Sequence, residues 1–187
     1  MQEVANSELE LGSGIRIRVD RREAISAAFV TYHSELCGFI RRGTRDETAA
    51  EDLLQDAFLR LAREISAGRS PDNIRAWLYR VAANLIVSRA RRRRTVVDWL
   101  ARQGRGDTTS VAGPEVSILR RERSLEVDEA LAGLSSDART ALLLASQGFS
   151  GEEIAEAIGK SPAATRAMMC RARVRVRLEL ERNELPT

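Results

Sequence analysis

GFSGEEIAEAIGKSPAATR, residues 148 to 166, carries the clearest structural signal, because it marks two helix starts and the turn between them. Ser150 is placed to cap the first helix, and Glu153 three positions later completes a capping box. Gly159 stands where that helix ends and a left-handed backbone is favoured. Ser161 then caps a second helix with Pro162 at its first position, where a missing N–H is tolerated. A short helix, a tight turn and a longer basic helix are typical of a helix-turn-helix, which places its second helix in the DNA major groove.

The composition around this motif favours helices and a polyanionic ligand. Aromatic residues make up only 4% of the chain, whereas Ala, Leu, Arg and Glu are abundant. The net charge is +3, but nine Arg face one Asp in residues 75–105, and seven basic residues face two acidic ones in residues 160–182. Two basic stretches predict two contacts with a polyanion such as DNA. The alternative is that both are ordinary solvated helix faces.

The sequence lacks the groupings that metal, disulfide or catalytic sites need. Cys37 and Cys170 are far apart and without metal-ligand spacing, so we expect reduced thiols in the cytoplasm. His33 lies four residues before Cys37, which leaves one weak two-ligand pair as the alternative. No apolar run approaches the ~20 residues that span a bilayer. We therefore expect no metal, no cofactor, no enzymatic activity and no membrane contact.

Apolar periodicity divides the chain into two predicted helical domains. Stripes with a spacing of three and four indicate helices at residues 22–42 and 46–63 and a third that starts near residue 72. These helices form the first predicted domain, residues 21–95, after an extension at 1–20 in which alternation at 15–19 gives a weak strand signal. Gly and Pro punctuate the predicted linker 96–124, and the second domain occupies 125–187. The expected fold class is all-α, with two small helical domains joined by a flexible linker.

The second predicted helix carries an acidic and amide-rich face opposite its apolar stripe, formed by Glu51, Asp52, Gln55 and Asp56. Such a face repels DNA but suits a basic protein partner; an ordinary solvated helix face is the alternative reading.

The third predicted helix combines one amide, two aromatic rings and an arginine tract. Asn84 stands among Val, Ala and Leu residues, where it either hydrogen-bonds a base edge or is a surface polar residue. Trp77 and Tyr79 offer rings for stacking on single-stranded bases, although Trp77 lies on the apolar stripe and is better explained as core. Arg89 and Arg91–Arg94 suit backbone phosphates, which give affinity without sequence information.

Three segments, in order, resemble the sigma-70-type sigma factors of bacteria. AEDLLQDAFLRL at 50–61 resembles the region 2 helix that binds core RNA polymerase, and IRAWLYRVAAN at 74–84 with the arginine tract resembles the helix that recognises and melts the −10 element. Residues 114–134, the helix-turn-helix and Arg171-Ala-Arg173 resemble region 4, which reads the −35 element. The short spacer is similar to that of the extracytoplasmic-function (ECF) subgroup.

The resemblance implies a transcription initiation factor that is monomeric when free. Its implied partners are core RNA polymerase (β′ clamp and β flap), duplex −35 DNA, single-stranded −10 DNA and an anti-sigma factor. The residues implied to bind core polymerase are Glu51, Asp52, Leu54, Gln55 and Asp56. Those implied at the −10 element are Asn73, Arg75, Tyr79, Arg80, Asn84, Arg89, Arg91 and Arg92, with the turn 67–73 forming the base pocket. Those implied at the −35 element are Ser161, Thr165, Arg166, Met168, Arg171 and Arg175.

The predicted recognition helix departs from the family pattern. Ala164 replaces a hydroxyl, and Met168 stands where a long basic residue is common, so we expect weaker or altered direct readout of the −35 sequence. Arg166 is the first choice for a guanine contact. The alternative function is a helix-turn-helix regulator that binds operator DNA without polymerase. Such a regulator explains the C-terminal domain but not the acidic helix, and it is expected to dimerise.

Overall fold

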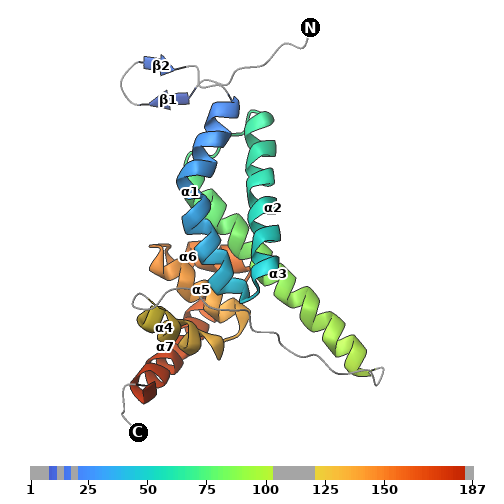
Figure 1. Ribbon diagram of the computed structural model, residues 1–187, viewed down its shortest axis with the longest axis vertical. Helices are drawn as coiled ribbons and strands as arrows, with labels where there is room; N and C mark the ends of the chain where they lie inside the picture. The colour runs from blue at the N-terminus through green and yellow to red at the C-terminus, as the bar shows by residue number, and fades with distance from the viewer. Residues whose placement is uncertain (1–8, 12–14, 18–20, 103–120, 184–187) are drawn as a thin grey trace.

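The computed structural model describes residues 9–11, 15–17, 21–102 and 121–183. Within these ranges the chain forms a short antiparallel pair, β1 (Leu9–Leu11) and β2 (Ile15–Ile17), followed by seven helices. The helices are α1 (Arg21–Thr44), α2 (Glu47–Ser66), α3 (Ile74–Arg102), α4 (Arg121–Ala132), α5 (Ser136–Ser146), α6 (Gly151–Ile158) and α7 (Pro162–Asn183). Figure 1 shows α1, α2 and α3 as one bundle with α4–α7 packed at its lower end. The predicted all-α class is confirmed, and β2 coincides with the weak strand signal.

The junction between α1 and α2 is tight because two special backbone positions meet there. Gly43 is buried against Ile86, where an added Cβ would lie 2.7 Å from the side chain. Arg45 adopts a left-handed φ of 56°, and the side chain of Asp46 then caps α2 by accepting from the Ala49 N–H at 3.0 Å. The two helices therefore run antiparallel and bury their apolar stripes together.

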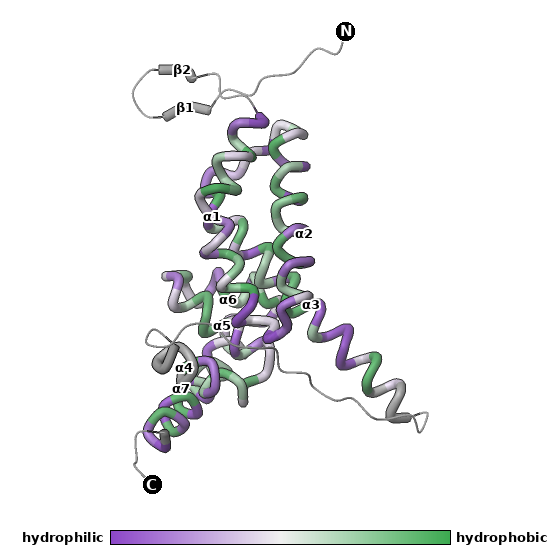
Figure 2. The backbone as a smooth tube through the Cα atoms, viewed as in Figure 1, coloured by the Kyte–Doolittle hydropathy of each residue, from purple (hydrophilic) through white to green (hydrophobic). Residues whose placement is uncertain are grey.

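Helix α3 extends past residue 95, where the first predicted domain was expected to end. Asn73 starts it by accepting a hydrogen bond from the Ala76 N–H at 2.9 Å. No Gly or Pro interrupts residues 74–102, and the helix continues to Arg102. Figure 2 shows the hydrophilic arginine tract on the part of α3 that projects from the bundle.

The second bundle contains the predicted helix-turn-helix with the predicted caps. The Ser150 hydroxyl accepts from the Glu153 N–H at 3.3 Å, and the Glu153 carboxylate accepts from the Ser150 N–H at 2.8 Å. Gly159 ends α6 with a φ of 64°, in the left-handed conformation. Ser161 accepts from the Ala164 N–H at 3.3 Å at the start of α7. These contacts confirm the local signals read from the sequence.

The two bundles pack against each other. Helix α3 contacts α5 and α6, and α1 contacts α5, so one continuous cluster of buried apolar residues spans both. Tyr79 contacts both bundles within this cluster, because its ring centroid lies 4.9 Å from that of Phe39 and 5.9 Å from that of Phe149. Most of the predicted linker lies outside the described residues.

Candidate nucleic-acid interface

The outward face of α2 is acidic, as the sequence predicts. Glu51, Asp52 and Gln55 are exposed on it, and Asp56 is half-buried. The carboxylate of Asp56 holds the guanidinium of Arg60 in two hydrogen bonds, at 3.1 Å from Nε and 3.0 Å from Nη2. This face therefore presents a group of hydrogen-bond acceptors, with Arg60 beside it.

Two hollows flank Asn84 on α3, and both include Arg60 of α2. The first, of about 470 Å³, is lined by Arg60, Asn84, Leu85, Ser88, Arg91 and Arg92. The second, of about 360 Å³, is lined by Arg60, Trp77, Arg80, Val81 and Asn84 together with Glu156 and Ala157 of α6. Guanidinium, hydroxyl and amide groups meet at the first hollow, a donor-rich arrangement that suits a nucleotide.

The second bundle holds two arginines of α1–α3 that the sequence assigns to DNA. Arg75 donates to the carboxylate of Glu35 at 2.8 Å and to the side-chain oxygen of Gln147 in the second bundle, and its guanidinium lies 4.8 Å from the Tyr79 ring centroid. Arg91 donates to the backbone oxygen of Ile158 at 2.7 Å, at the C-terminal end of α6. A helix C-terminus attracts a cation, so this pairing is favourable.

A carboxylate reinforces the contact of Arg91 with the second bundle. Asp137, whose side chain is 12% exposed, lies 3.8 Å from Arg91 and 2.9 Å from Lys160. The two bundles are thus joined by polar contacts as well as by the apolar cluster.

A buried guanidinium donates hydrogen bonds near the C-terminal ends of α1 and α4. Arg139 donates to the backbone oxygens of Leu131 at 3.0 Å and Leu134 at 2.9 Å, and across the bundle boundary to that of Gly43 at 3.2 Å. Burial, and secondarily the nearby charge of Arg45, lower the pKa of Arg139. One guanidinium therefore supplies separate N–H donors to carbonyls from both bundles.

Helix α7 has an inner and an outer face. Thr165, Met169 and Ala172 are buried at a spacing of four and three, so they form the inner face. Arg166 and Arg171 are exposed, and with Thr165 facing inward the outer face at the start of α7 is formed largely by alanines. A helix that presents arginines beside small side chains leaves room for close approach to a groove.

Family models match both bundles. The model described as Sigma-70 region 2 matches residues 28–105, and the one described as Sigma-70, region 4 matches residues 124–176. RNA polymerase sigma factor CarQ of Myxococcus xanthus is 33% identical over 174 residues, which cover 89% of this chain and 97% of CarQ. ECF RNA polymerase sigma factor SigX of Bacillus subtilis is 25% identical over 170 residues, covering 87% of this chain and 88% of SigX. The chain belongs to the ECF sigma factors of the sigma-70 family.

Two solved structures share the fold of this sigma factor. The sigma factor RpoE of Bartonella quintana, in complex with the anti-sigma factor NepR, is 24% identical with a TM-score of 0.63 and covers 85% of this chain and 98% of that one. CnrH, in complex with the cytosolic domain of CnrY, is 22% identical with a TM-score of 0.57 and covers 87% of this chain and 91% of that one. At this identity both support the fold.

In region 2 of the sigma factor, two predicted contact residues are corrected. Leu54 is 5% exposed and Tyr79 is 1% exposed, so both belong to the core and present no surface to polymerase or DNA in this conformation. Burial is also the main cause that raises the pKa of Tyr79. Of the remaining predicted −10 residues, Asn84, Arg80, Arg91 and Arg92 line the two hollows, and Asn73, Arg75 and Arg89 do not. Arg89 instead lies 3.8 Å from the Asp46 carboxylate.

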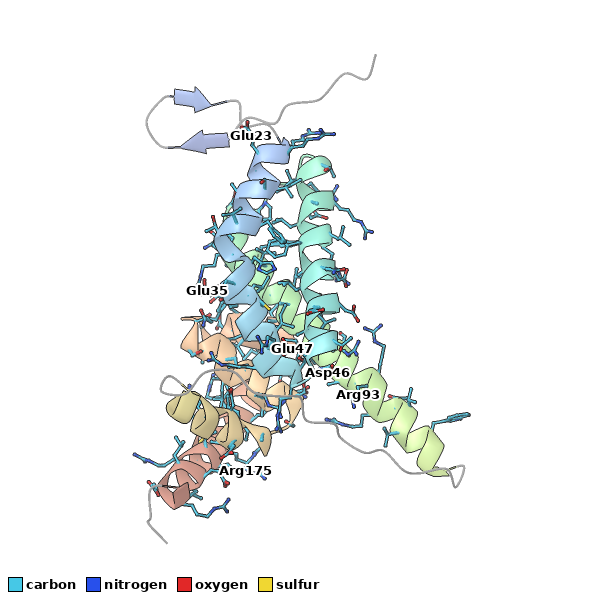
Figure 3. The ribbon with its side chains drawn as sticks, in the orientation of Figure 1. Glu23, Glu35, Asp46, Glu47, Arg93 and Arg175 are labelled. Atoms are coloured by element: carbon cyan, nitrogen blue, oxygen red, sulfur yellow. The ribbon has the colours of Figure 1, made fainter. Side chains whose placement is uncertain are left out.

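In region 4, Thr165 is the prediction that the structure contradicts. Its side chain is 1% exposed because it lies on the same inner stripe as Met169. Arg166 and Arg171 are exposed, Met168 is half-buried against the core, and Ser161 caps α7. Arg175 points toward the turn between α4 and α5, where its guanidinium lies over Gly133; Figure 3 shows it on α7 beside α4.

Three residues that sequence reasoning missed lie in these hollows. Arg60 and Ser88 line the first, and Arg173 lines a hollow of about 450 Å³ on region 4 together with Arg166. The signal was present in the helical spacing, since Ser88 is four residues after Asn84 and Arg173 is seven after Arg166. Arg60 is four residues after Asp56, but its proximity to Asn84 depends on the packing of α2 on α3.

Within the described ranges, no group of three or more His, Cys, Asp or Glu residues is placed to hold a metal ion. In the same part of the chain, no helix is both long and apolar enough to cross a membrane.

Proposed function

We propose that this sigma factor binds core RNA polymerase through the acidic face of α2, holds the melted −10 strand at Asn84, and docks α7 on the −35 duplex. The observation that carries the proposal is the presence, on one three-helix domain, of an exposed acidic face and a donor-rich hollow. An operator-binding regulator needs neither feature, and the family match favours the sigma factor.

The core-binding assignment rests on Glu51, Asp52 and Gln55. All three are exposed on α2, which suits a basic surface of the polymerase clamp. Charged groups at such an interface set register and association rate as well as affinity. Asp56 stands apart from them because it already holds Arg60.

The −10 assignment rests on the hollow beside Asn84. The amide of Asn84 is exposed and offers both donor and acceptor to the edge of an unstacked base. Arg92 and Arg80 stand on the same helix for the adjoining phosphates. Tyr79 is buried while Phe149 of region 4 packs beside it, so stacking on that ring would need the separation of regions 2 and 4 described below.

The −35 assignment rests on α7 with fewer direct contacts than the sequence predicts. Arg166 and Arg171 remain exposed for base edges and phosphates, and Arg173 joins them. Because Ala164 and Ala167 carry no polar side-chain atoms and Thr165 is buried, region 4 relies on arginines and on the fit of its backbone to the groove.

Promoter capture on this proposal accompanies separation of regions 2 and 4. Arg75 and Arg91 bond to Gln147 and Ile158 of region 4, so the same donors are not available to DNA while those contacts persist. We also infer an anti-sigma factor as a partner, supported by the fold shared with the sigma factor RpoE, which is solved in complex with the anti-sigma factor NepR.

The test of the proposal is binding of the purified chain to bacterial core RNA polymerase, in competition with a housekeeping sigma factor. We expect one-to-one binding that the competitor displaces. The double variant Glu51→Arg and Asp52→Arg should weaken binding by at least about tenfold, since charge pairs at interfaces carry couplings of this size. Asp56 is left unchanged so that Arg60 keeps its position.

The matched control is Glu23→Arg, a charge reversal at an exposed position of the first turn of α1, away from the acidic face (Figure 3). It should bind core polymerase like the parent chain. Absence of core binding by the parent chain at micromolar concentration would refute the proposal. If the double variant and Glu23→Arg lost the same affinity for core polymerase, the acidic face would not be the binding surface.

A further inference from the structure

Arg60 connects the two surfaces of region 2 that the proposed function uses separately. It is carried by α2, the helix with the acidic face, but its side chain lines both hollows around Asn84 of α3. The other cationic residues of those hollows, Arg80, Arg91 and Arg92, all belong to α3. Arg60 thus reaches the proposed −10 site from the opposite wall.

The first hollow is suited to an anionic strand. Among the described residues that line it, three are arginines and none is acidic. Its volume of about 470 Å³ lies in the range of small-ligand pockets, which is enough for one nucleotide unit. The second hollow is completed by Glu156 and Ala157 of region 4, whereas the residues that line the first all belong to region 2, so the first remains when the two regions separate.

The guanidinium of Arg60 is held in a defined orientation. Asp56 accepts hydrogen bonds from its Nε and Nη2. A guanidinium has five N–H donors in a fixed plane, so this two-point contact leaves the Nη1 edge for another acceptor. A guanidinium oriented in this way loses less side-chain entropy on binding a phosphate than a free one.

We propose that Arg60 contacts a backbone phosphate of the melted −10 strand, next to the base held at Asn84, and that Asp56 positions its guanidinium for this contact. The proposal rests on the proposed function, because it takes the hollow as the site of single-stranded promoter DNA. It assigns part of the DNA site to the helix that faces polymerase.

The test uses holoenzyme assembled from core polymerase and the full chain. The probe is duplex DNA with a short unpaired bubble of randomised sequence, and core polymerase alone provides the background. The compared chains are the parent, Arg60→Ala, Arg60→Lys and Arg63→Ala. Arg63 is the matched control, because it is an exposed arginine of α2 and lines neither hollow. Binding is measured over a series of salt concentrations, with core affinity checked in parallel.

We expect Arg60→Ala to weaken bubble binding by about tenfold, as loss of a charge-assisted phosphate contact does. The slope of log K against log salt should fall by about 0.7, the value for one phosphate contact on a single strand. Arg60→Lys should keep the slope and recover part of the affinity, since it keeps the charge but loses the planar fork. Arg63→Ala should change neither quantity.

Sequencing the bound fraction separates a phosphate contact from a base contact. Phosphate contacts carry no sequence information, so Arg60→Ala and the parent should select the same bubble sequences, whereas Asn84→Ala should select different ones. A changed selection with Arg60→Ala overturns the phosphate assignment.

The positioning role of Asp56 has its own readout. Asp56→Asn should weaken bubble binding less than Arg60→Ala does and should have no further effect when Arg60 is already Ala. Additive effects of the two substitutions overturn that role. If Arg60→Ala equals Arg63→Ala in affinity and slope, the Arg60 contact is refuted. If the parent holoenzyme binds no better than core alone, the proposed function fails first, and this inference with it.

Discussion

Arg139→Met tests whether one buried guanidinium holds the end of α4 to the rest of the protein. Its donors satisfy the backbone oxygens of Leu131, Ala132 and Leu134 in region 4 and of Gly43 in region 2, at 2.9–3.2 Å. Met has similar length and fills the same space, but it donates no hydrogen bond. The substitution therefore removes these bonds without leaving a large cavity.

The expected loss follows from these contacts. A hydrogen bond from a charged donor contributes about 1.5–3 kcal/mol, and the loss is not additive within one side chain. Removal of the charge also returns its desolvation cost, which is several kcal/mol for a buried ion. The net loss for local opening of α4 and α5 is therefore about 3 kcal/mol, which corresponds to a roughly 150-fold change in the opening equilibrium.

Hydrogen exchange by mass spectrometry on the full chain measures this opening. The amides of α4 and α5 should exchange roughly 150-fold faster in Arg139→Met, while those of α2 change little. The control is Arg177→Met, because the side chain of Arg177 is 81% exposed and pairs with Glu181 on the surface. Acceleration of less than about fivefold in α4 and α5, equivalent to about 1 kcal/mol, would refute the role given to Arg139.

Three further predictions concern single positions. Burial raises the pKa of Tyr79, so the neutral phenol stabilises the folded chain fully below pH about 10, and this contribution is lost as the pH rises above that value. The variant Tyr32→Phe leaves Tyr79 as the only tyrosine, and its ultraviolet titration should show no phenolate near pH 10 in the folded chain. Gly159→Ala should destabilise α6 by about 1–2 kcal/mol, because φ is 64°, whereas Gly151→Ala, with open space around its Cα, should not; amide exchange in α6 distinguishes the two. Gln147→Ala removes the side-chain oxygen that accepts from Arg75 and leaves the 3.5 Å contact to the backbone oxygen of the same residue. It should raise the affinity of the free chain for single-stranded DNA by about twofold to fivefold in fluorescence anisotropy, while Gln55→Ala on α2 should not. Equal affinities would show that the side-chain contact does not restrain Arg75.

The local features of this fold could be predicted because each depends on neighbours in sequence. Ser150 and Glu153 form their capping box within one turn, and Gly159 ends α6 through its own backbone freedom. The apolar stripe of α2 follows from a spacing of three and four. The acidic face of α2 is the complement of that stripe, so the same pattern predicted it.

The corrected residues depend on packing between elements. Tyr79 lies on a second face of α3, which is buried because region 4 covers that side of the helix. No pattern in the neighbouring sequence predicts this contact. Thr165 is different, because it precedes Met169 by one turn. Its place on the same helix face as the apolar Met169 indicates burial, yet a hydroxyl at the start of a recognition helix favoured a DNA contact. Arg60 needed the packing of α2 on α3 before its place beside Asn84 could be known.

On the proposed function, the bonds that Arg75 and Arg91 make to region 4 compete with DNA for the same donors. Regions 2 and 4 belong to one chain, so the effective concentration of one at the other is set by the chain that joins them. It does not change with the amount of protein in the cell. On the proposed function, each promoter then has its apparent affinity divided by the same factor, the reciprocal of the open fraction. The order of promoters by affinity is unchanged, but the promoters with the weakest affinity are no longer occupied. On this proposal, the contact between the two regions sets one threshold of binding strength for all promoters, and a substitution at Gln147 shifts that threshold without altering any base contact.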